Sequence, residues 1–429
     1  MIPTASVNDA TILCLGCISL IPLAIAGIVL MNAGLGRSRN AAHFVLSALC
    51  VFSIAVAVYV VCGFAFQGAP GGSSYYFVAG GKPWSWIAAG RFFLRGILLD
   101  GSPRSLIFLL QIFAVGLAAI IPLGAGGGRW RLSASAISAA LLTGCTYPLY
   151  AHWVWGGGWL AELGTNFGLG TGFTDAGGST TIQAVGGVTG LCAAWILGPR
   201  RGKYTSSGMP AAIPGHDMVM AGFGCLLAIA GWLGLNSAGA LLFAGIAPGA
   251  VVLVGLNTVL SAAFSTLAAI FFTRLRFGKP DASLSMNGCV GGLVASSAGC
   301  AVLSPLTAAL TGIVAGALVT YSVELLDVRL RVDDPGGAIP IHGVCGIWGA
   351  IAVALFAANA PGQWLAQFAG VATILGFVLP LSYGLNWAIN RVWPMRVSPE
   401  AERQGLDLHE LGAGAYPEFI THGDEFTAG

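Results

Sequence analysis

The sequence contains very few charged side chains. Asp, Glu, Lys and Arg make up only 8% of its 429 residues, whereas hydrophobic residues make up 56%. A soluble globular chain carries about 25% charged residues, so this chain lacks the charge needed to cover a surface in water. Its formal net charge of +2 does not point to a partner, and no nucleic acid is expected. Many apolar segments instead reach the roughly 20 residues needed to cross a bilayer, which predicts a polytopic membrane protein.

Groupings of residues that would indicate catalysis or a bound metal are also missing. The ten cysteines lie mostly inside apolar runs, where cysteine behaves as a small buried residue. Their spacing indicates neither a metal site nor a disulfide framework. Cys14 and Cys17 form a C-x-x-C pair, but it falls inside a predicted membrane span, which argues against a redox role. No nucleophile–base pair is recognisable, so we expect neither an enzyme nor a cofactor.

About eleven apolar segments are long enough to be transmembrane helices, which predicts an all-α fold. The first has no Lys or Arg before Arg37, so it lacks the basic region of a secretory signal and is predicted to be a membrane span. The 64 glycines permit close packing between helices in a membrane. The expected spans are 10–32, 41–66, 104–126, 131–154, 179–198, 217–239, 247–273, 285–302, 305–325, 338–358 and 366–391.

The distribution of basic residues predicts the orientation of these spans. Only Lys82, Arg91, Arg95 and Arg104 fall on one side of the membrane. Cytoplasmic loops are enriched in Lys and Arg, so we expect the N-terminus outside and the C-terminus in the cytoplasm, which agrees with an odd number of spans. Residues 1–393 then form the transmembrane domain and 394–429 a cytoplasmic tail. The basic residues on the cytoplasmic side are Arg37, Arg39, Arg129, Arg131, Arg200, Arg201, Lys203, Arg274, Arg276, Lys279, Arg329, Arg331, Arg391, Arg396 and Arg403.

Two distant stretches, 175–190 and 334–349, share one pattern. Each begins Asp-x-Gly-Gly and continues through Ile and a polar residue to x-Val-x-Gly; the polar residue is Gln183 in the first copy and His342 in the second. The copies lie five spans apart, and an odd number of spans per repeat turns the second copy upside down. Inverted repeats are typical of transporters and channels, with the site near the membrane midplane. The chain is therefore predicted to contain two inverted five-helix repeats plus a final helix.

The polar residues of these motifs are the first candidates for a pathway. An ionisable residue inside a span is costly and by default marks a pathway; the alternative for His342 is a neutral imidazole bonded to a neighbouring helix. Gln183 donates and accepts hydrogen bonds but takes up no proton, so the pair can hold a small polar molecule without relaying protons as two imidazoles would. Asp175 and Asp334 precede the glycine pairs, and helix capping is favoured for them over direct contact with a cationic solute.

Further candidates lie at the predicted outer surface. Trp155 is followed by three glycines that would leave its face open, and it could offer a cation–π contact to an ammonium-like ion. The tryptophans of 84–86 are expected to be belt residues at the level of the lipid headgroups, and Trp153 and Trp159 could be belt residues as well. Asn236 is interpreted either as a helix-packing hydrogen bond or as part of the outer mouth.

At these residues the chain resembles the ammonium transporter family (Amt/Rh/methylammonium permease) over nearly its whole length. Several long motifs in the right order carry the resemblance, and the most specific is 333–335 followed by 342–349. The other matching segments are 32–40, 151–158, 175–179, 231–236, 286–288, 405–407 and 415–416.

The resemblance implies a homotrimer in the cytoplasmic (inner) membrane, with eleven spans and one narrow pore per subunit. An outer site recruits ammonium with a tryptophan matching Trp155, two phenylalanines close the pore, and two histidines line its hydrophobic lumen. Ammonium gives up its proton, and ammonia and the proton cross by separable routes. A carboxylate matching Asp175 supports both deprotonation and the helix structure. PII-type cytosolic regulators bind family members.

The chain departs from the family pattern at the pore itself. The first pore histidine is replaced by Gln183, whereas the second is retained as His342. Losing one imidazole should impair proton relay, so we expect flux that is electroneutral, slower or less selective.

The gate and the recruitment site are altered as well. The phenylalanine of span six appears as Leu235 and the serine that assists recruitment as Gly239. The other gate phenylalanine falls at Phe113 or Ala114, because the alignment around Gln111 is ambiguous by one residue. These losses should widen and weaken the outer site.

The leading interpretation is transport of ammonium or ammonia through a narrow pore lined by Gln183 and His342. One alternative is an ammonium-binding sensor. Such a sensor would signal through a cytosolic partner, because no kinase-like or cyclase-like domain follows Trp393. Another is a pore for a different small neutral solute, such as methylamine or carbon dioxide.

Overall fold

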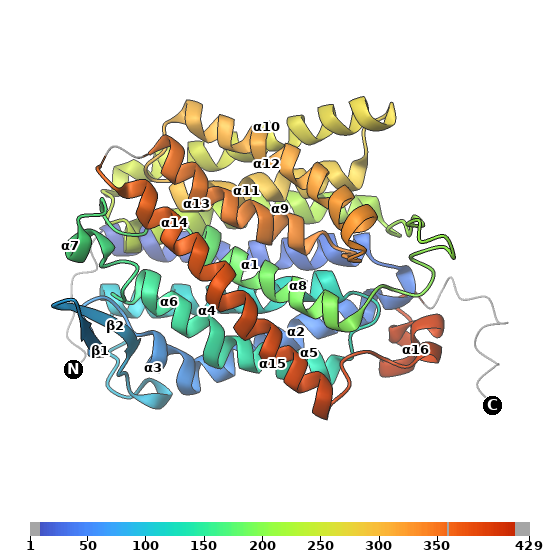
Figure 1. The fold of residues 1–429 in the computed structure, drawn as a ribbon, viewed down its shortest axis with the longest axis horizontal. Helices are drawn as coiled ribbons and strands as arrows, with labels where there is room; N and C mark the ends of the chain where they lie inside the picture. Colours follow the sequence, from blue (N-terminus) through green and yellow to red (C-terminus); the bar gives the residue numbers. More distant parts are fainter. Residues whose placement is uncertain (1–8, 358–359, 417–429) are drawn as a thin grey trace.

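Long helices run side by side along the longest direction of the molecule (Figure 1). This computed structural model describes residues 9–357 and 360–416. Several of the long segments contain a π-helical turn (η). In chain order they are α1 (Asp9–Leu35); α2 (Ala41–Val58), η2 (Tyr59–Gly63) and α3 (Phe64–Gln67); α4 (Pro103–Gly126); α5 (Leu132–Leu141), η4 (Leu142–Thr146) and α6 (Tyr147–Trp155); η5 (Ser179–Ala184) and α8 (Val185–Leu197); α9 (Met218–Phe243); α10 (Val251–Phe277); α11 (Ala282–Gly299); α12 (Pro305–Glu324) and η7 (Leu325–Leu330); η8 (Ile339–Val344) and α13 (Cys345–Phe356); and α14 (Gln363–Thr373), η9 (Ile374–Val378) and α15 (Leu379–Val392).

Ten of the described helical segments are long and apolar enough to cross a membrane, and they correspond to ten of the predicted spans. The remaining predicted span, 285–302, corresponds to α11, which has 18 residues but carries Asn287 and several serines. It is buried from Asn287 to Gly299 and packs against α10, α12 and α13. The mainly helical membrane fold is therefore confirmed, while the count of eleven spans and the orientation of the termini stay predictions.

Local sequence signals explain where several helices begin. The side chains of Ser102 and Ser304 each accept a hydrogen bond from the backbone N–H three residues on, and each is followed by a proline at the first helical position. Asp217 and Asp281 cap α9 and α11 in the same way. Such caps satisfy backbone donors that have no partner inside the helix, and proline is favoured at the first helical position.

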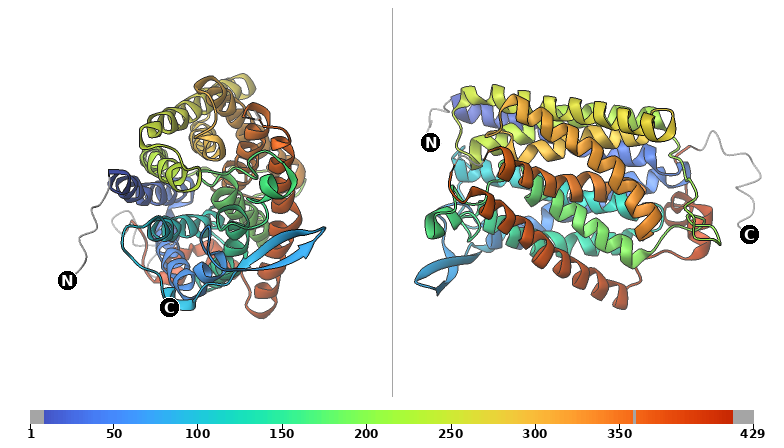
Figure 2. Two further views of the ribbon diagram at one scale, coloured as in Figure 1. Left: turned by 90° about the vertical axis from the view of Figure 1, so that its left-hand side faces the viewer. Right: turned by 45° about the horizontal axis from the view of Figure 1, so that its top comes forward.

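A β-hairpin interrupts the helical pattern in the long predicted outer segment and was not predicted from the sequence. Strand β1 (Ser74–Ala79) pairs with β2 (Lys82–Ala88), and the strands project from one end of the bundle (Figures 1 and 2). Gly80 and Gly81 form the two-residue turn, both with positive φ, as the favoured hairpin turn requires. A Gly-Gly pair between aromatic runs was the signal that could have revealed it.

The expectation that Trp153 is a belt residue is wrong. Only 1% of its surface is exposed, and its indole Nε1 donates a hydrogen bond to the carbonyl of Trp86, 2.7 Å away, in β2. Its ring also packs against Phe377 with ring centroids 4.6 Å apart. Trp153 thus holds the hairpin to the bundle, and it is Trp86 that remains exposed.

The first helices of the two predicted repeats, α1 and α9, pack against each other. Near the end of α1, Asn32 abuts Gly336 of the second Asp-x-Gly-Gly motif; near the end of α9, Asn236 abuts Gly177 of the first. Each repeat therefore places an asparagine against the motif of the other repeat. This reciprocal exchange is the geometry that two inverted copies produce.

The described part of the tail docks on the bundle at the end opposite the hairpin (Figure 1). It contains α16 (Pro399–Gln404) and the turn η10 (Asp407–Leu411). The carboxylate of Asp407 accepts hydrogen bonds from the N–H groups of Ala42 and His43, at 3.2 and 2.7 Å. Residues 417–429 of the predicted tail lie outside the described residues.

Candidate functional site

The two repeated motifs bring Gln183 and His342 into contact. The Nδ1 of His342 lies 2.7 Å from the Oε1 of Gln183, and both side chains are almost completely buried. They sit on the π-helical turns η5 and η8 that begin α8 and α13. Gly187 permits the close approach, because a Cβ at that position would overlap the backbone of Gly343. The pairing predicted from the repeat is therefore present in the fold.

This contact leaves hydrogen-bonding groups of both side chains open. The Nε2 of Gln183 is buried and has no partner among the described residues. The amide and ring orientations are assignments, but both choices have the same consequence. If the Oε1 of Gln183 accepts from the Nδ1–H of the ring, the amide NH₂ is an open donor and the Nε2 of His342 is an open acceptor. If the amide is turned so that its NH₂ donates to Nδ1, the amide oxygen is the open acceptor and the Nε2–H of His342 is an open donor. Either way the pair presents at least one donor and one acceptor.

The two aspartates of the motifs bind the backbone at the start of the π-helical turns. The Oδ2 of Asp175 accepts from the N–H groups of Thr180 and Thr181, at 3.0 and 2.8 Å, and from both hydroxyls. Asp334 accepts from the N–H groups of Ala338 and Ile339, at 3.0 and 2.7 Å. Both contacts are of the capping kind. They fix the turns that carry the two polar side chains.

The two carboxylates differ in what surrounds them. The Oδ1 of Asp175 is buried and has no partner among the described residues. Asp334 lies outside the spans, near Arg129 and Asp333. Burial raises the pKa of Asp334 to about 6, against the opposing effect of its two backbone hydrogen bonds. The second cap can therefore take up a proton near neutral pH.

Trp155 is held beside the first cap but does not have the open face that the following glycines suggested. Its Nε1 donates to the backbone carbonyl of Asp175, 2.9 Å away. The ring of Phe243 stacks on its face, with centroids 4.5 Å apart and an interplanar angle of 4°. Sequence reasoning missed Phe243 because the predicted span stopped at residue 239, whereas α9 continues to Phe243.

Gly239 does not open the outer site, contrary to expectation. It lies against the backbone of Ala176 and Gly177, and a Cβ at residue 239 would overlap the carbonyl oxygen of Ala176. The missing side chain therefore leaves no space, because the Asp-x-Gly-Gly segment fills it. Leu235, one helical turn earlier, is likewise only 1% exposed and belongs to the core.

Asn236 occupies a packing position between helices. Its Nδ2 donates to the hydroxyls of Thr258 and Ser296, at 2.9 and 3.1 Å, and so joins α9 to α10 and α11. Its Oδ1 is buried against Gly177 and has no hydrogen-bond partner among the described residues. Of the two interpretations of Asn236, the geometry matches the packing hydrogen bond.

The structure separates the two candidates for the first gate position. Phe113 is partly exposed at the edge of the core, whereas Ala114 is completely buried. Gln111 is also buried, and its Oε1 accepts a hydrogen bond from the hydroxyl of Tyr147, 2.6 Å away. Of the two candidates, Ala114 is therefore the one that lies in the bundle interior, and its side chain is only a methyl group.

Comparisons with known proteins agree with this architecture. A model of the Ammonium Transporter Family matches residues 12–416. The chain is 35% identical to ammonium transporter Amt2 of Archaeoglobus fulgidus, over 92% of this chain and 85% of the relative. It is 30% identical to the ammonium transporter of Bacillus subtilis, over 94% of this chain and 97% of the relative.

Solved structures share the fold. A protein described as "Sensor Amt Protein" superposes with a TM-score of 0.85 at 27% identity, over 94% of this chain and 98% of that chain. Candida albicans Mep2 superposes with a TM-score of 0.79 at 23% identity, over 96% and 91%. The second likeness concerns the fold alone.

Proposed function

This chain belongs to the ammonium transporter family, and we propose that it conducts ammonia, the neutral form of ammonium, past the Gln183–His342 pair. Its relatives are named as transporters, so its activity is transport and not catalysis. The observation that carries the proposal is the 2.7 Å contact between the two side chains, which leaves at least one donor and one acceptor open whichever way the amide is oriented.

One open donor and one open acceptor match a neutral molecule. Ammonia has N–H donors and a lone pair, so it can satisfy both groups of the pair. Ammonium has four donors and no acceptor, so the open donor of the pair would face another donor. A buried donor left without a partner costs about 1–3 kcal/mol, in addition to the much larger cost of bringing a bare cation into an apolar interior.

The proton left behind by ammonia has no second imidazole to receive it. Gln183 does not titrate, so a relay through the pair would have to pass a residue that holds no extra proton. We therefore infer transport without net charge movement. The caps at Asp175 and Asp334 support this assignment indirectly, by fixing the backbone turns on which the two polar side chains sit.

The experiment is flux and current measured on the same proteoliposomes. After an ammonium jump, ammonia entry raises the internal pH, which a trapped dye reports, and charge movement appears as current on a supported membrane. We expect alkalinisation with little current for the unaltered protein and a several-fold larger current for Gln183→His. Gln404→His, an exposed position on α16, is the matched control and should change neither. A large, ammonium-selective current in the unaltered protein would contradict the proposal.

A second candidate is an ammonium sensor that acts through a cytosolic partner. It is supported by the likeness to the "Sensor Amt Protein" and by a tail whose Asp407 binds the start of α2. Saturable ammonium binding without flux in the same vesicles would favour this candidate. Flux of methylamine or carbon dioxide that matches that of ammonia would favour a general pore for small neutral solutes.

The assembly and location follow the family. We propose a homotrimer in the cytoplasmic (inner) membrane, with the tail on the cytoplasmic side. A PII-type regulator would then approach the end of the bundle where α16 and η10 dock. Cross-linking of the purified protein and tail accessibility in sealed inside-out vesicles test these two points.

A further inference from the structure

The hairpin formed by β1 and β2 exposes large apolar side chains on both of its faces. Tyr75, Tyr76 and Val78 have 68, 64 and 66% of their surface exposed, and neighbouring residues of a strand point to opposite faces. Phe77, which lies among them, is exposed as well. A lone two-stranded hairpin is only marginally stable in water, and an exposed apolar patch marks an interaction site. The hairpin thus has the surface of a segment that a partner covers.

The base of the hairpin is attached at the edge of the predicted bilayer. The ring of Trp86 in β2 packs on that of Trp153, with centroids 4.9 Å apart, and Trp153 packs on Phe377 with centroids 4.6 Å apart. Trp153 lies near the end of one candidate span, whereas Phe377 lies midway along another, Gln363–Val392. Two ring contacts therefore connect β2 to the middle of a membrane span. The exposed part of Trp86 consequently lies at the level of the lipid.

The strands also extend past the side of the bundle. In the end-on view of Figure 2 they cross the long segment of α14 and α15 and continue beyond the outline of the helices. That segment carries exposed apolar side chains, among them Trp364, Phe368 and Leu375. Exposed apolar side chains along a membrane-spanning helix face the hydrocarbon of the bilayer. The hairpin therefore overhangs a side of the bundle that faces lipid.

Basic side chains accompany these apolar residues. Residues 68–99 contain three cations, Lys82, Arg91 and Arg95, and neither Asp nor Glu. All three side chains are exposed, and none forms an ion pair with the described residues. An exposed Phe-Phe pair separates the two arginines. Aromatic rings mixed with Lys and Arg are typical of segments that lie at the membrane–water interface.

The acidic side chains at the same end of the molecule leave this local charge in place. Asp175 is buried and caps η5. Asp9 begins α1, and Asp100 lies beside that helix start, since the residue after it is next to Thr11. Glu162, in the loop that follows α6, is half-buried, and burial raises its pKa. Along the hairpin one carboxylate therefore accompanies three cations.

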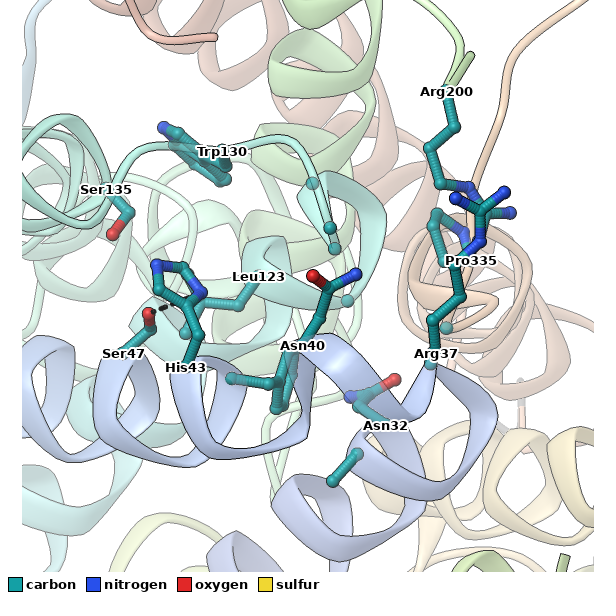
Figure 3. A pocket seen from close by; sticks show the side chains of 18 residues that line it. Asn32, Arg37, Asn40, His43, Ser47, Leu123, Trp130, Ser135, Arg200 and Pro335 are labelled. Atoms are coloured by element: carbon teal, nitrogen blue, oxygen red, sulfur yellow. Dashed lines mark hydrogen bonds between the residues drawn. The ribbon is translucent and has the colours of Figure 1, made fainter. Parts of the chain in front are cut away.

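Arginines at the opposite end of the bundle are bound differently. Figure 3 shows Arg200 at a pocket there. Its guanidinium binds the carboxylate of Asp333 at 2.8 Å, and that carboxylate also lies 3.8 Å from Arg129. Such cations are neutralised within the protein. The cations of the hairpin segment project from the protein instead, where they are available to an external anion.

We propose that residues 74–95 dock on phospholipid headgroups beside the bundle and prefer anionic lipid. The rings of Tyr75, Tyr76 and Trp86 lie among the headgroups, where Tyr and Trp are enriched. The long basic side chains extend to the phosphates, and anionic lipid strengthens this attraction. The unpaired edge of β1 could also pair with a second chain, but the overhang above lipid-facing helices and the unpaired cations favour the bilayer. The assignment is independent of what crosses the pore.

The test follows amide hydrogen exchange of residues 74–88 in the full-length protein by mass spectrometry. One set of nanodiscs contains phosphatidylcholine alone, and in the other phosphatidylglycerol replaces part of it. We expect exchange at least about threefold slower with phosphatidylglycerol, because anionic lipid attracts basic segments. The difference should shrink in 1 M salt, which screens exposed charges over about 3 Å.

Lys82→Gln should reduce the difference, and Lys82→Gln combined with Arg91→Gln and Arg95→Gln should abolish it. Lys279→Gln is the matched control, because Lys279 is an exposed cation in the loop between α10 and α11 and should keep the full difference. Equal exchange of the unaltered protein in both lipids would overturn the proposal.

A second readout identifies the occupant directly. Phosphatidylglycerol with a photoreactive diazirine near its headgroup is added to the nanodiscs, and adducts are located by peptide mapping. We expect adducts within residues 74–95 of the unaltered protein and of Lys279→Gln, and their loss in the triple variant. Cross-links from β1 to a second copy of the chain, without lipid adducts, would show that a protein covers the hairpin and would contradict the assignment.

Discussion

Gly239→Ser distinguishes what the family pattern suggests from what the packing dictates. The family carries a serine here, so the pattern alone suggests that the substitution repairs an outer recruitment site. In the structure a Cβ on residue 239 would overlap the carbonyl oxygen of Ala176. The preceding residue, Asp175, caps η5 with its carboxylate and accepts a hydrogen bond from Trp155 with its backbone carbonyl. Forcing extra atoms into a packed site costs about 1–3 kcal/mol, so we expect lower stability and weaker, not stronger, transport.

The measurement is thermal unfolding of the purified protein together with ammonium flux in vesicles. Gly255→Ser is the matched control. Gly255 also lies in a helix, α10, and a Cβ there would meet no atom nearer than 3.7 Å. We expect Gly239→Ser to lower the unfolding temperature by several degrees relative to this control. An unchanged unfolding temperature with faster flux would refute the reasoning, because it would mean that the 176–177 backbone yields to a side chain.

Two further outcomes follow from charges near the tail. Asp333→Asn leaves Arg129 and Arg200 buried without their shared carboxylate, and breaking a buried pair costs about 3–5 kcal/mol, so unfolding should occur at markedly lower temperature. For Glu410, burial would raise the pKa, but the hydrogen bond from His43 and other donors lowers it below its ordinary 4.5. The contribution of Glu410 to tail docking should therefore be complete above about pH 4.5 and be lost as the pH falls through the lower pKa of the docked state. Protease accessibility of the tail, measured from pH 3 to 7, would report this loss. The Glu410→Gln variant should lack this pH dependence.

The sequence alone predicted the spans and the central contact because both rest on patterns that run along the chain. Apolar length marks a membrane helix whatever its neighbours are, and α4 begins and ends within a residue of the predicted 104–126. The repeated Asp-x-Gly-Gly motif predicted that Gln183 and His342 share a depth, and the structure joins them at 2.7 Å. Periodicity and repetition carry this information without reference to tertiary contacts.

The errors arose where the outcome depends on which distant segment fills a space. Nothing near Gly239 in the sequence shows that the 176–177 backbone lies against it. The burial of Trp153 likewise depends on a hairpin some 70 residues earlier in the chain. Trp155 was expected to be open because its following neighbours are glycines, but its face is covered by Phe243 from another helix. Local composition cannot report such contacts.

The arrangement of caps explains how the chemistry of the Gln183–His342 pair can change while the scaffold stays the same. Asp175 and Asp334 bind the backbone of η5 and η8 rather than the side chains of Gln183 and His342. The position of each polar group is therefore set by the backbone, and its chemistry by one side chain. Exchanging an imidazole for an amide at residue 183 keeps the contact with His342 but removes a site for a proton. It follows that charge movement should depend on residue 183, whereas stability should depend on the two aspartates.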